Sequence, residues 1–478
     1  MEDINMQWSR YSEALFDAFS NTDDNIIVQA CPGAGKTTNI KHLWTLDDKP
    51  TVYLVFNKHN QLEVQGKMGD KAESDVLTLN GLGHRILMDN YGRRLKLDNR
   101  KVYTIIKDIE VFTHWDKRKF EKTGDLAKAV TMAKQYFLKD DIGEDAFNEM
   151  CSVYDLEQYD DMYSDAINVL QESDDRKLLI DFADQIRFPA LFDLHMPQYD
   201  NVLGDEWQDA SPIQLKMVRK LDARRYVFVG DTHQSIYGFR GAMDNSMEIT
   251  ADMFSCVTLP LSITYRCAKN IVKEAYRIFP DIEEWDESGE GLVRYSDIEN
   301  ERYEKSDIVL CRFNAPLVEL AYTLLRQGIA CHVRGSDIAQ GLVRLIDKQK
   351  AVSVADLIDK LSQWHETEVY KARRKEDEGK EKSVDDKYNS LMLFTEKCNL
   401  NEDVSCVKTQ IELLFAEGRG VCLSTIHKAK GLEAERAMVL GSKSLPIVTK
   451  RQQPWQAKQE RNCQYVAVTR AKSELIYM

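Results

Sequence analysis

The stretch NIIVQACPGAGKTTNI, residues 25–40, is the most informative part of the sequence about the fold. A β-branched apolar run leads into a glycine-rich loop ending in Gly-Lys-Thr, which predicts a buried strand, a loop and a helix starting near Lys36. Gly33 and Gly35 leave room for backbone N–H groups to approach phosphate oxygens, and the helix start adds its positive dipole end. The stretch therefore predicts a phosphate-binding loop in an α/β domain.

The Gly-Lys-Thr ending assigns a role to each of its two side chains. Lys36 is placed to reach the β- and γ-phosphates of a nucleotide, and the Thr37 hydroxyl is placed to bind Mg²⁺. A chance glycine turn is the alternative interpretation. The strand before the loop, the helix after it and the complete ending favour a working nucleotide site.

Length and composition set the outer limits. A chain of 478 residues exceeds one ordinary core, so we expect two or more domains. No apolar run has the length of a membrane span, and the acidic, polar start MEDINMQWSR does not resemble a signal peptide. The ten cysteines include no C-x-x-C pair, which argues against zinc or an iron–sulfur cluster and predicts free thiols in a reducing cytoplasm. A net charge of −14 does not exclude nucleic acid, because a local basic groove can bind phosphates.

The remaining chain alternates between two kinds of sequence pattern, one typical of strands and one typical of helices. Short, continuous apolar runs such as TVYLVF predict strands covered on both faces, as in a parallel α/β sheet. These runs form two blocks along the chain, and each block is interrupted by a helical, polar segment. We therefore expect two α/β domains, each with a mostly helical insertion. The expected boundaries are 1–85 and 181–256 for the first domain, 86–180 for its insertion, 257–340 and 418–478 for the second domain, and 341–417 for its shorter insertion.

A second motif, LGDEWQDASPIQ, supplies carboxylates at the end of an apolar strand. Asp205 is placed to hold Mg²⁺ through water, and Glu206 is placed to polarise an attacking water as general base. A bare Asp-Glu pair is most often solvated surface. The pattern Asp-Glu-x-Gln-Asp directly after a strand is more specific.

A third motif, VGDTHQSIYGFRGA, spans residues 229–242. Asp231 ends another strand, and Gln234 follows at the same sheet edge, where it could sense the γ-phosphate. Two aromatics and a cation then fall within four residues, Tyr237, Phe239 and Arg240. Core packing is the alternative for the aromatics, but their glycine and arginine neighbours favour stacking surfaces for unpaired bases.

Together with three later stretches, these motifs resemble the UvrD/Rep/PcrA family of superfamily 1 DNA helicases. ACPGAGKT matches the family's phosphate loop, which accounts for Ala30 in place of the usual glycine. DEWQD and VGDTHQSIYGFRGA match its second and third motifs. The later stretches are ITYRC at 263–267, LSTIHKAKGLEAERAMVLG at 423–441 and QERNCQYVAVTRAK at 459–472, all in family order.

The resemblance implies two RecA-like motor domains and the cofactors ATP and Mg²⁺. Tyr265 would stack on the adenine, Glu433 would contact the ribose, and arginines of the second domain would reach the γ-phosphate. The implied catalytic residues are Glu206, Gln234, Arg266 and Arg470. The implied ATP-binding residues are Ala30, Cys31, Pro32, Gly33, Ala34, Gly35, Lys36, Thr37, Thr38, Tyr265 and Glu433, with Thr37 and Asp205 for Mg²⁺.

The resemblance also implies a DNA-binding surface. Its residues are Phe56, Asn57, Asn80, Tyr237, Phe239, Arg240, Thr425, His427 and Lys430. His427 alone would be interpreted as a core histidine, and its place inside TIHKAKGLE favours binding. The implied partners are single-stranded DNA, single/double-strand junctions and unidentified replication or repair proteins, with no membrane, in the cytoplasm of a bacterium or a phage-infected host.

The function implied is ATP-driven 3′-to-5′ movement on single-stranded DNA with duplex unwinding, the direction resting on the resemblance alone. Two alternatives stay open: a DNA-stimulated translocase that remodels nucleoprotein with little unwinding, and a nucleotide-switched DNA-binding scaffold. The paired motor motifs disfavour a small-molecule kinase. Ser12 or Tyr11 stands where the family usually has an adenine-reading glutamine, which leaves strictness for ATP open.

Overall fold

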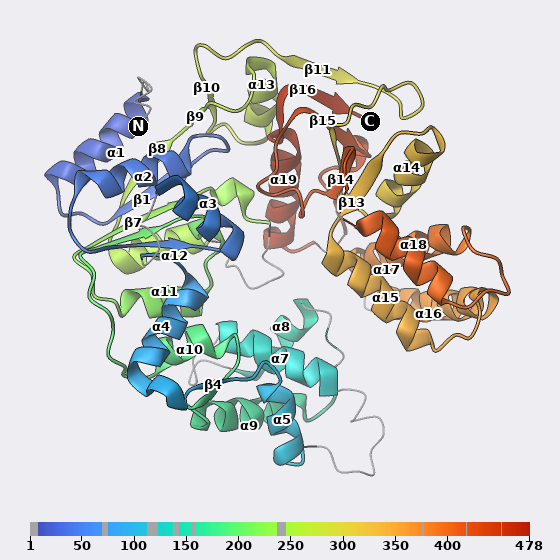
Figure 1. The fold of residues 1–478 in the computed structure, drawn as a ribbon, viewed down its shortest axis with the longest axis horizontal. Helices are drawn as coiled ribbons and strands as arrows, with labels where there is room; N and C mark the ends of the chain where they lie inside the picture. The colour runs from blue at the N-terminus through green and yellow to red at the C-terminus, as the bar shows by residue number, and fades with distance from the viewer. Residues whose placement is uncertain are drawn as a thin grey trace. The chain divides into compact units, whose positions relative to one another are not determined.

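The computed structural model describes residues 8–68, 75–111, 123–136, 143–153, 156, 158–236, 245–374, 377–416, 418–450 and 452–478. The chain divides into two compact units, Met1–Ser262 and Ile263–Met478, and each is described by itself. Each unit is built on a six-stranded sheet in which all pairings are parallel (Figure 1). The predicted α/β class with two parallel-sheet domains is confirmed. None of the described helices is long and apolar enough to cross a membrane.

The first sheet has the strand order β3-β2-β6-β7-β1-β8. Its strands are β1 (Ile26–Ala30), β2 (Thr51–Val55), β3 (Val76–Thr78), β6 (Asn201–Gly204), β7 (Arg225–Gly230) and β8 (Val257–Leu261). The surrounding helices are α1 (Arg10–Asn21), α2 (Lys36–Leu46), α3 (Lys58–Met68), α4 (Leu79–Tyr91), α10 (Asp184–Leu191), α11 (Pro212–Arg219) and α12 (Ser246–Phe254). Every residue of β2, β6 and β7 is buried, which explains their continuous apolar sequences.

The last strand of this sheet corrects the expected domain boundary. The sequence places residues 257–340 in the second domain. In the structure β8 pairs with β1, with Val28 opposite Leu259, so residues 257–261 complete the first sheet. The first unit therefore ends at Ser262.

A helical layer inserted between α4 and α10 has its own apolar core. It consists of α5 (Lys101–Asp108), α7 (Thr123–Tyr136), α8 (Glu144–Val153) and α9 (Met162–Asp175), preceded and followed by the short paired strands β4 (Lys96–Leu97) and β5 (Leu179–Ile180). Its buried core residues include Ile105, Leu126, Val130, Phe147 and Val169.

Buried charges join this insertion to α10. Lys101 and Lys134, both fully buried, place their Nζ atoms 2.7 and 2.8 Å from the two oxygens of Asp184. Lys134 also lies 2.6 Å from Asp181. Burial lowers the pKa of Lys101 and raises that of Asp184, although the attraction between the two opposes both changes. The buried charges are therefore stable only as a group.

The second sheet has the order β11-β16-β15-β12-β14-β13. Its strands are β11 (Leu292–Tyr295), β12 (Ile308–Cys311), β13 (Cys331–Arg334), β14 (Val421–Thr425), β15 (Ala434–Leu440) and β16 (Ala471–Tyr477). The helices of the sheet layer are α13 (Lys269–Ile278), α14 (Ala315–Arg326) and α19 (Pro454–Val468), and the short strands β9 (Ile263–Thr264) and β10 (Glu283–Glu284) pair separately.

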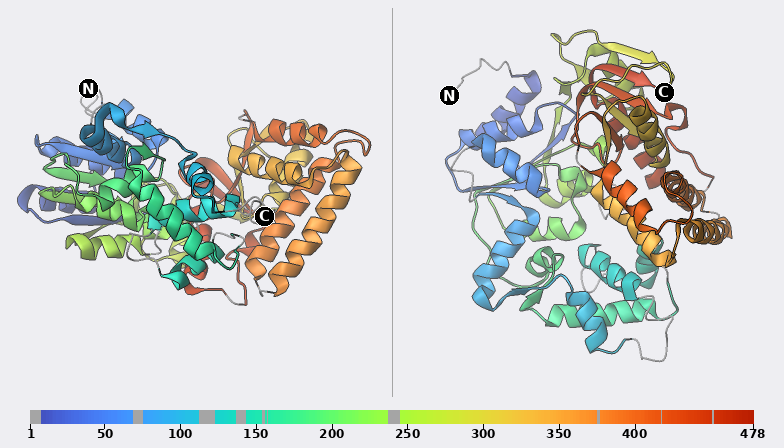
Figure 2. Two further views of the ribbon diagram at one scale, coloured as in Figure 1. Left: turned by 90° about the horizontal axis from the view of Figure 1, so that it is seen from below. Right: turned by 45° about the vertical axis from the view of Figure 1, so that its right-hand side comes forward.

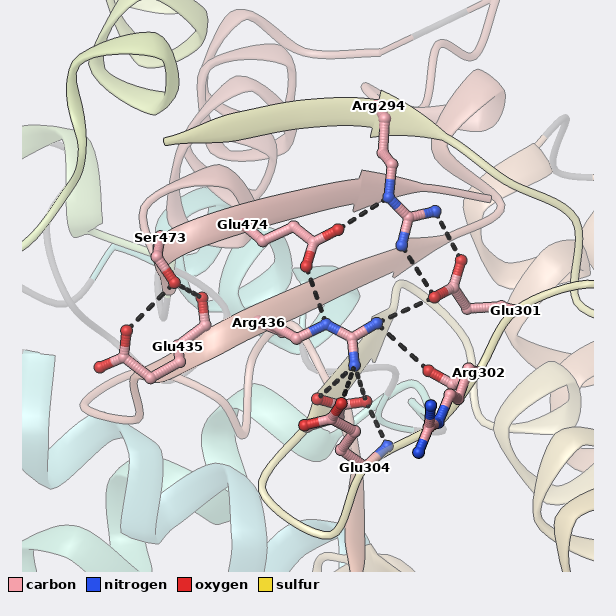
Figure 3. Close-up of polar contacts among 9 residues, drawn as sticks. Arg294, Glu301, Arg302, Glu304, Glu435, Arg436, Ser473 and Glu474 are labelled. Atoms are coloured by element: carbon pink, nitrogen blue, oxygen red, sulfur yellow. Dashed lines mark hydrogen bonds and ion pairs between the residues drawn. The ribbon is translucent and has the colours of Figure 1, made fainter. Parts of the chain in front are cut away.

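Figure 3 shows a polar network of mostly buried side chains that links β11 and β15 to β16. Glu301 bridges Arg294 at 2.7 Å and Arg436 at 2.9 Å, and Glu474 of β16 bridges the same two arginines at the same distances. Hydrogen bonds from Arg294 lower the pKa of Glu301 to about 2. The network therefore ties the connection after β11 to the sheet.

The second unit also carries a helical insertion. Its helices are α15 (Ser336–Gln349), α16 (Val354–Arg374), α17 (Glu378–Thr395) and α18 (Ser405–Phe415). The long helices α16 and α17 lie side by side (Figure 2). Cys398, in the connection between α17 and α18, forms a disulfide with Cys406 of α18. The expectation that all ten cysteines are free thiols is therefore wrong for this pair.

Candidate active site

The glycine-rich loop leaves β1 at Ala30 and enters α2 at Lys36. Gly33 and Gly35 have φ angles of +77° and +73°, a left-handed conformation that favours glycine. The Asn39 side chain donates to the Gly35 carbonyl at 2.9 Å and holds the first turn of the helix. This loop presents its backbone at the carboxyl edge of the sheet, where parallel α/β sheets bind ligands.

The carboxylates of the second motif lie next to this loop. Asp205 directly follows β6, and its Oδ2 accepts a hydrogen bond from the Thr37 hydroxyl at 3.4 Å. Lys36 Nζ lies 3.2 Å from Glu206 Oε1. Glu206 has a φ of +52°, a strained conformation for a side-chain-bearing residue that costs about 1–3 kcal/mol and is typical of functional sites.

Gln208 links the second and third motifs. Its Nε2 donates to Glu206 Oε2 at 2.5 Å, and its Oε1 accepts from the Asp231 backbone N–H at 2.8 Å. A Cβ at Gly230 would lie 2.7 Å from Gln208 Oε1, so the close approach requires glycine there. Sequence reasoning quoted the Asp-Glu-x-Gln-Asp pattern but assigned no role to this glutamine.

The third motif closes the cluster. Gln234 Nε2 donates to Asp231 Oδ2 at 2.7 Å, and both side chains are buried. Because β6, β7 and β1 are neighbours, the residues after their carboxyl ends meet at one edge. The structure thus brings together the first-unit residues Lys36, Thr37, Asp205, Glu206 and Gln234, which were predicted from three separate motifs.

The charges at this edge shift one another's proton affinity. Burial by itself would lower the pKa of Lys36, but Glu206, Asp231 and Asp205 together raise it, so the lysine is charged. Burial, with a contribution from Glu206, raises the pKa of Asp205 to about 6. Burial also raises the pKa of Asp231. A site with crowded carboxylates and one cation is suited to receive a further cation.

The residues present fit a magnesium nucleotide. Hydroxyl and carboxylate oxygens are the ligands that Mg²⁺ prefers, and Thr37 and Asp205 offer one of each within 3.4 Å. The backbone of residues 30–38 and the Lys36 ammonium supply donors for phosphate oxygens. Assignment of the individual loop residues to ATP stays a prediction.

The second-unit residues predicted for the nucleotide form their own cluster. Arg266 Nε lies 2.7 Å from Glu433 Oε2, and Lys472 Nζ lies 2.7 Å from the other oxygen of Glu433. Partial burial would raise the pKa of Glu433, but Lys472 and Arg266 together lower it. Tyr265 is 38% exposed, and its ring meets the Trp285 ring edge-on with 5.5 Å between the ring centroids.

Arg470 is held differently. Its side chain is buried, its Nε donates to the Val466 carbonyl at 3.0 Å, and its Nη1 donates to the Leu432 carbonyl at 3.2 Å. Its Nη2 donates to the Thr469 hydroxyl at 3.2 Å. These hydrogen bonds fix the Arg470 guanidinium to residues of its own unit.

The predicted DNA-binding residues of the first unit lie after strand ends. Phe56 is half-buried and Asn57 is exposed, directly after β2. The Asn80 side chain donates to the Phe182 carbonyl at 2.8 Å, and Phe182 is 61% exposed. Phe182, in the stretch LLIDFADQI, belongs to none of the sequence motifs. Tyr237, Phe239 and Arg240 lie outside the described residues.

In the second unit Thr425 ends β14 and is buried, whereas His427 and Lys430 are half-buried in the turn that follows. His427 Nε2 lies 3.6 Å from Cys463 Sγ of α19. The proposed DNA contacts are therefore grouped by the fold within each unit. Their binding role stays a prediction.

Two models of known protein families match this chain. A model of the UvrD/REP helicase N-terminal domain matches residues 12–254, half of the chain, and a UvrD-like helicase C-terminal domain model matches residues 342–478. The chain belongs to the UvrD/REP helicase family. This confirms the resemblance stated from the motifs.

Individual relatives are distant. DNA helicase II of Salmonella typhimurium is 26% identical over 289 residues, which cover 54% of this chain and 39% of the relative. ATP-dependent DNA helicase PcrA of Bacillus subtilis is 24% identical over 381 residues, 67% of this chain and 49% of the relative. The chain thus spans half or less of these relatives' length. The crystal structure of Arterivirus nonstructural protein 10 (helicase) aligns over 96% of this chain and 61% of its own, with 12% identity and a TM-score of 0.35, too low to carry an argument.

Proposed function

We propose that this chain is an ATP-dependent DNA motor that moves along single-stranded DNA in the 3′-to-5′ direction and unwinds duplex. The observation that carries the proposal is the cluster of Lys36, Thr37, Asp205, Glu206 and Gln234 at one sheet edge, in a chain of the UvrD/REP helicase family. The direction is taken from the family resemblance.

Each first-unit residue has a defined task in hydrolysis. Lys36 binds the β- and γ-phosphates, and Glu206 accepts a proton from the attacking water. Gln208 fixes the Glu206 carboxylate through the 2.5 Å hydrogen bond. Thr37 and Asp205 would hold Mg²⁺, which when bound would neutralise phosphate charge. Because Lys36 pairs with Glu206 at 3.2 Å, a bound triphosphate must draw the lysine away and so free the carboxylate for water.

The second unit would supply the switchable contacts. Arg266 and Arg470 stabilise charge on the γ-phosphate, Tyr265 stacks on the base and Glu433 contacts the ribose. Arginine contacts of this kind are worth about 10³–10⁵ in rate. On this proposal the two units are motor domains, divided at Ser262, and residues 86–180 and 341–417 are their insertions.

The DNA path is proposed to run over the residues grouped after the strand ends. It includes Phe56, Asn57 and Asn80 in the first unit, and Thr425, His427 and Lys430 in the second. Phe182 is proposed as a further base-stacking residue on this path, because it is an aromatic residue that is 61% exposed and its carbonyl accepts a hydrogen bond from Asn80. Tyr237, Phe239 and Arg240 are proposed as further contacts from their motif.

Strand displacement tests the proposal. Duplexes with a 3′ tail, a 5′ tail or blunt ends are incubated with the chain while ATP hydrolysis is followed in parallel. We expect hydrolysis stimulated by single strands and displacement only of the 3′-tailed substrate. Equal hydrolysis with and without DNA would contradict a DNA motor and favour the nucleotide-switched scaffold.

The second candidate is a translocase with little unwinding. The short insertion of α15, α16, α17 and α18 favours it over a full helicase. Displacement of streptavidin from a biotinylated single strand, without opening of the 3′-tailed duplex, would identify this activity.

A further inference from the structure

A tyrosine that no motif includes lies beside the candidate magnesium ligands. Tyr53 is the central residue of β2, and none of its side chain is exposed. Its hydroxyl donates a hydrogen bond to Asp205 Oδ2 at 2.9 Å. The register of β2 against β6, with Tyr53 opposite Leu203 and Leu54 opposite Gly204, brings the phenol alongside the end of β6.

This hydrogen bond completes the fixation of one carboxylate. Asp205 Oδ1 accepts the Glu206 backbone N–H at 2.8 Å, so that oxygen is tied to the main chain. Oδ2 receives two hydroxyls, Tyr53 at 2.9 Å and Thr37 at 3.4 Å. The Thr37 contact is the longer one, and Thr37 is itself a candidate magnesium ligand. If Thr37 turns to a metal, Tyr53 is the side chain that still holds Oδ2.

The phenol is itself held in place. Its ring lies in the fully buried strand β2 and meets the Trp44 ring of α2 edge-on at 6.2 Å. A buried tyrosine hydroxyl needs a partner, and Asp205 is the partner that the structure gives it. Because β2 and α2 fix the ring, the ring in turn fixes the direction of the carboxylate.

We propose that Tyr53 is a positioning residue for the magnesium–nucleotide site and acts by orienting the Asp205 carboxylate. The inference rests on the function proposed above. Groups that hydrogen-bond to a metal's ligands orient those ligands, and loss of one such group costs about 10–100-fold in metal affinity. Tyr53→Phe keeps the ring and removes only the hydroxyl, so it isolates this contribution.

The experiment measures nucleotide binding rather than turnover. Binding of a fluorescent ADP analogue to the full chain is titrated with Mg²⁺, and is measured separately in EDTA. We expect Tyr53→Phe to raise the Mg²⁺ concentration for half-maximal binding about tenfold or more, while affinity in EDTA stays within about twofold of wild type. The split between these two readouts separates orientation of a magnesium ligand from general damage to the loop.

Tyr159→Phe is the matched control. The Tyr159 hydroxyl donates to Asp165 Oδ2 at 2.7 Å in the helical insertion, so both variants lose one phenol–carboxylate hydrogen bond. A fall in melting temperature shared by both variants reports stability alone. A shift in magnesium dependence confined to Tyr53→Phe supports positioning.

Two results would overturn the inference. An unchanged Mg²⁺ midpoint for Tyr53→Phe rejects Tyr53 alone and leaves the proposed function intact. Absence of magnesium-dependent nucleotide binding in the wild-type chain rejects the proposed nucleotide site, and the inference falls with it.

If Tyr53→Phe does not fold, 3-fluorotyrosine is placed at this position instead, because its hydroxyl is a stronger hydrogen-bond donor. The same titration must then show a shifted Mg²⁺ midpoint. No shift then counts against the role.

Discussion

The two units hold their candidate catalytic groups in opposite ways. In the first unit, Lys36 Nζ lies 3.2 Å from one oxygen of Glu206, and Gln208 donates a hydrogen bond to the other oxygen. The candidate catalytic groups therefore hold one another in place. In the second unit, Arg266 is paired with Glu433, and Arg470 donates to backbone carbonyls. The first unit therefore groups its candidate catalytic residues at its own sheet edge, whereas the arginines of the second unit are bound to other residues of that unit.

This difference indicates which unit would control the rate of ATP turnover. A group whose partners belong to the same site is ready once the nucleotide binds. We expect a group held by other residues of its unit to contact the nucleotide only after it exchanges those bonds. The free energy of that new contact can then be linked to a conformational change. We expect substitutions in the first unit to alter nucleotide binding or chemistry, and substitutions of the two arginines in the second unit to alter turnover with little effect on nucleotide binding.

The largest expected effect tests the second unit. Arg266→Ala should lower the DNA-stimulated turnover number about 10³-fold or more, because a contact made to the developing phosphate charge is lost. Nucleotide affinity should change little. Steady-state hydrolysis and fluorescent-nucleotide binding measure the two quantities. Arg294→Ala, which removes an arginine that also pairs with carboxylates, is the control; equal losses in both variants would reject a specific role for Arg266.

The next effect tests the first unit. Glu206→Gln should reduce turnover about 10²–10⁴-fold, because the amide cannot accept a proton from water. The phosphate loop is unchanged, so binding of ATP and of single-stranded DNA should persist. Hydrolysis and binding assays on one preparation measure both. Near-normal hydrolysis would remove Glu206 as the base.

The third prediction concerns stability and compares the charge clusters of the two units. Lys134→Met leaves Asp184 and Asp181 buried with one cation fewer, and we expect a loss of about 3–5 kcal/mol in the free energy of unfolding. Lys472→Met, at a position 35% exposed, should cost less than about 1 kcal/mol. Urea unfolding measures both. Similar losses would contradict the contrast between buried and exposed pairing.

The smallest effect is a pH dependence in the second unit. The pKa of Glu301 is lowered from its ordinary value of 4.5 to about 2, so its charged form stabilises the fold. This stabilisation is complete above pH 4.5 and is lost as the pH falls towards 2. Glu301→Gln should therefore lower the melting temperature at pH 7, and the difference from wild type should narrow between pH 4.5 and 2. A difference that is constant with pH would contradict the assignment.

The sequence predicts those features that depend on local pattern. The strand–loop–helix around Lys36 is local, and parallel strands place their carboxyl ends at one edge, so Asp205, Glu206 and Gln234 could be grouped without coordinates. The α/β class and the family followed from the same motifs. The roles of these residues stay predictions.

Features that depend on non-local pairing could not be predicted. The run VTLPL suits either sheet, and only its pairing with β1 assigns it to the first unit. Tyr53 is one residue of a buried strand, and its hydroxyl finds Asp205 only because β2 lies beside β6. The Cys398–Cys406 pair, eight residues apart, depends on how the chain turns between α17 and α18.

On the proposed function, ATP hydrolysis that depends on Glu206 moves the chain along single-stranded DNA. The most direct measurement is stopped-flow fluorescence of the chain on single strands of increasing length that carry a dye at the 5′ end. We expect an arrival time that grows linearly with strand length in the presence of ATP, and no arrival signal for Glu206→Gln. An arrival time independent of length in the wild-type chain would contradict it.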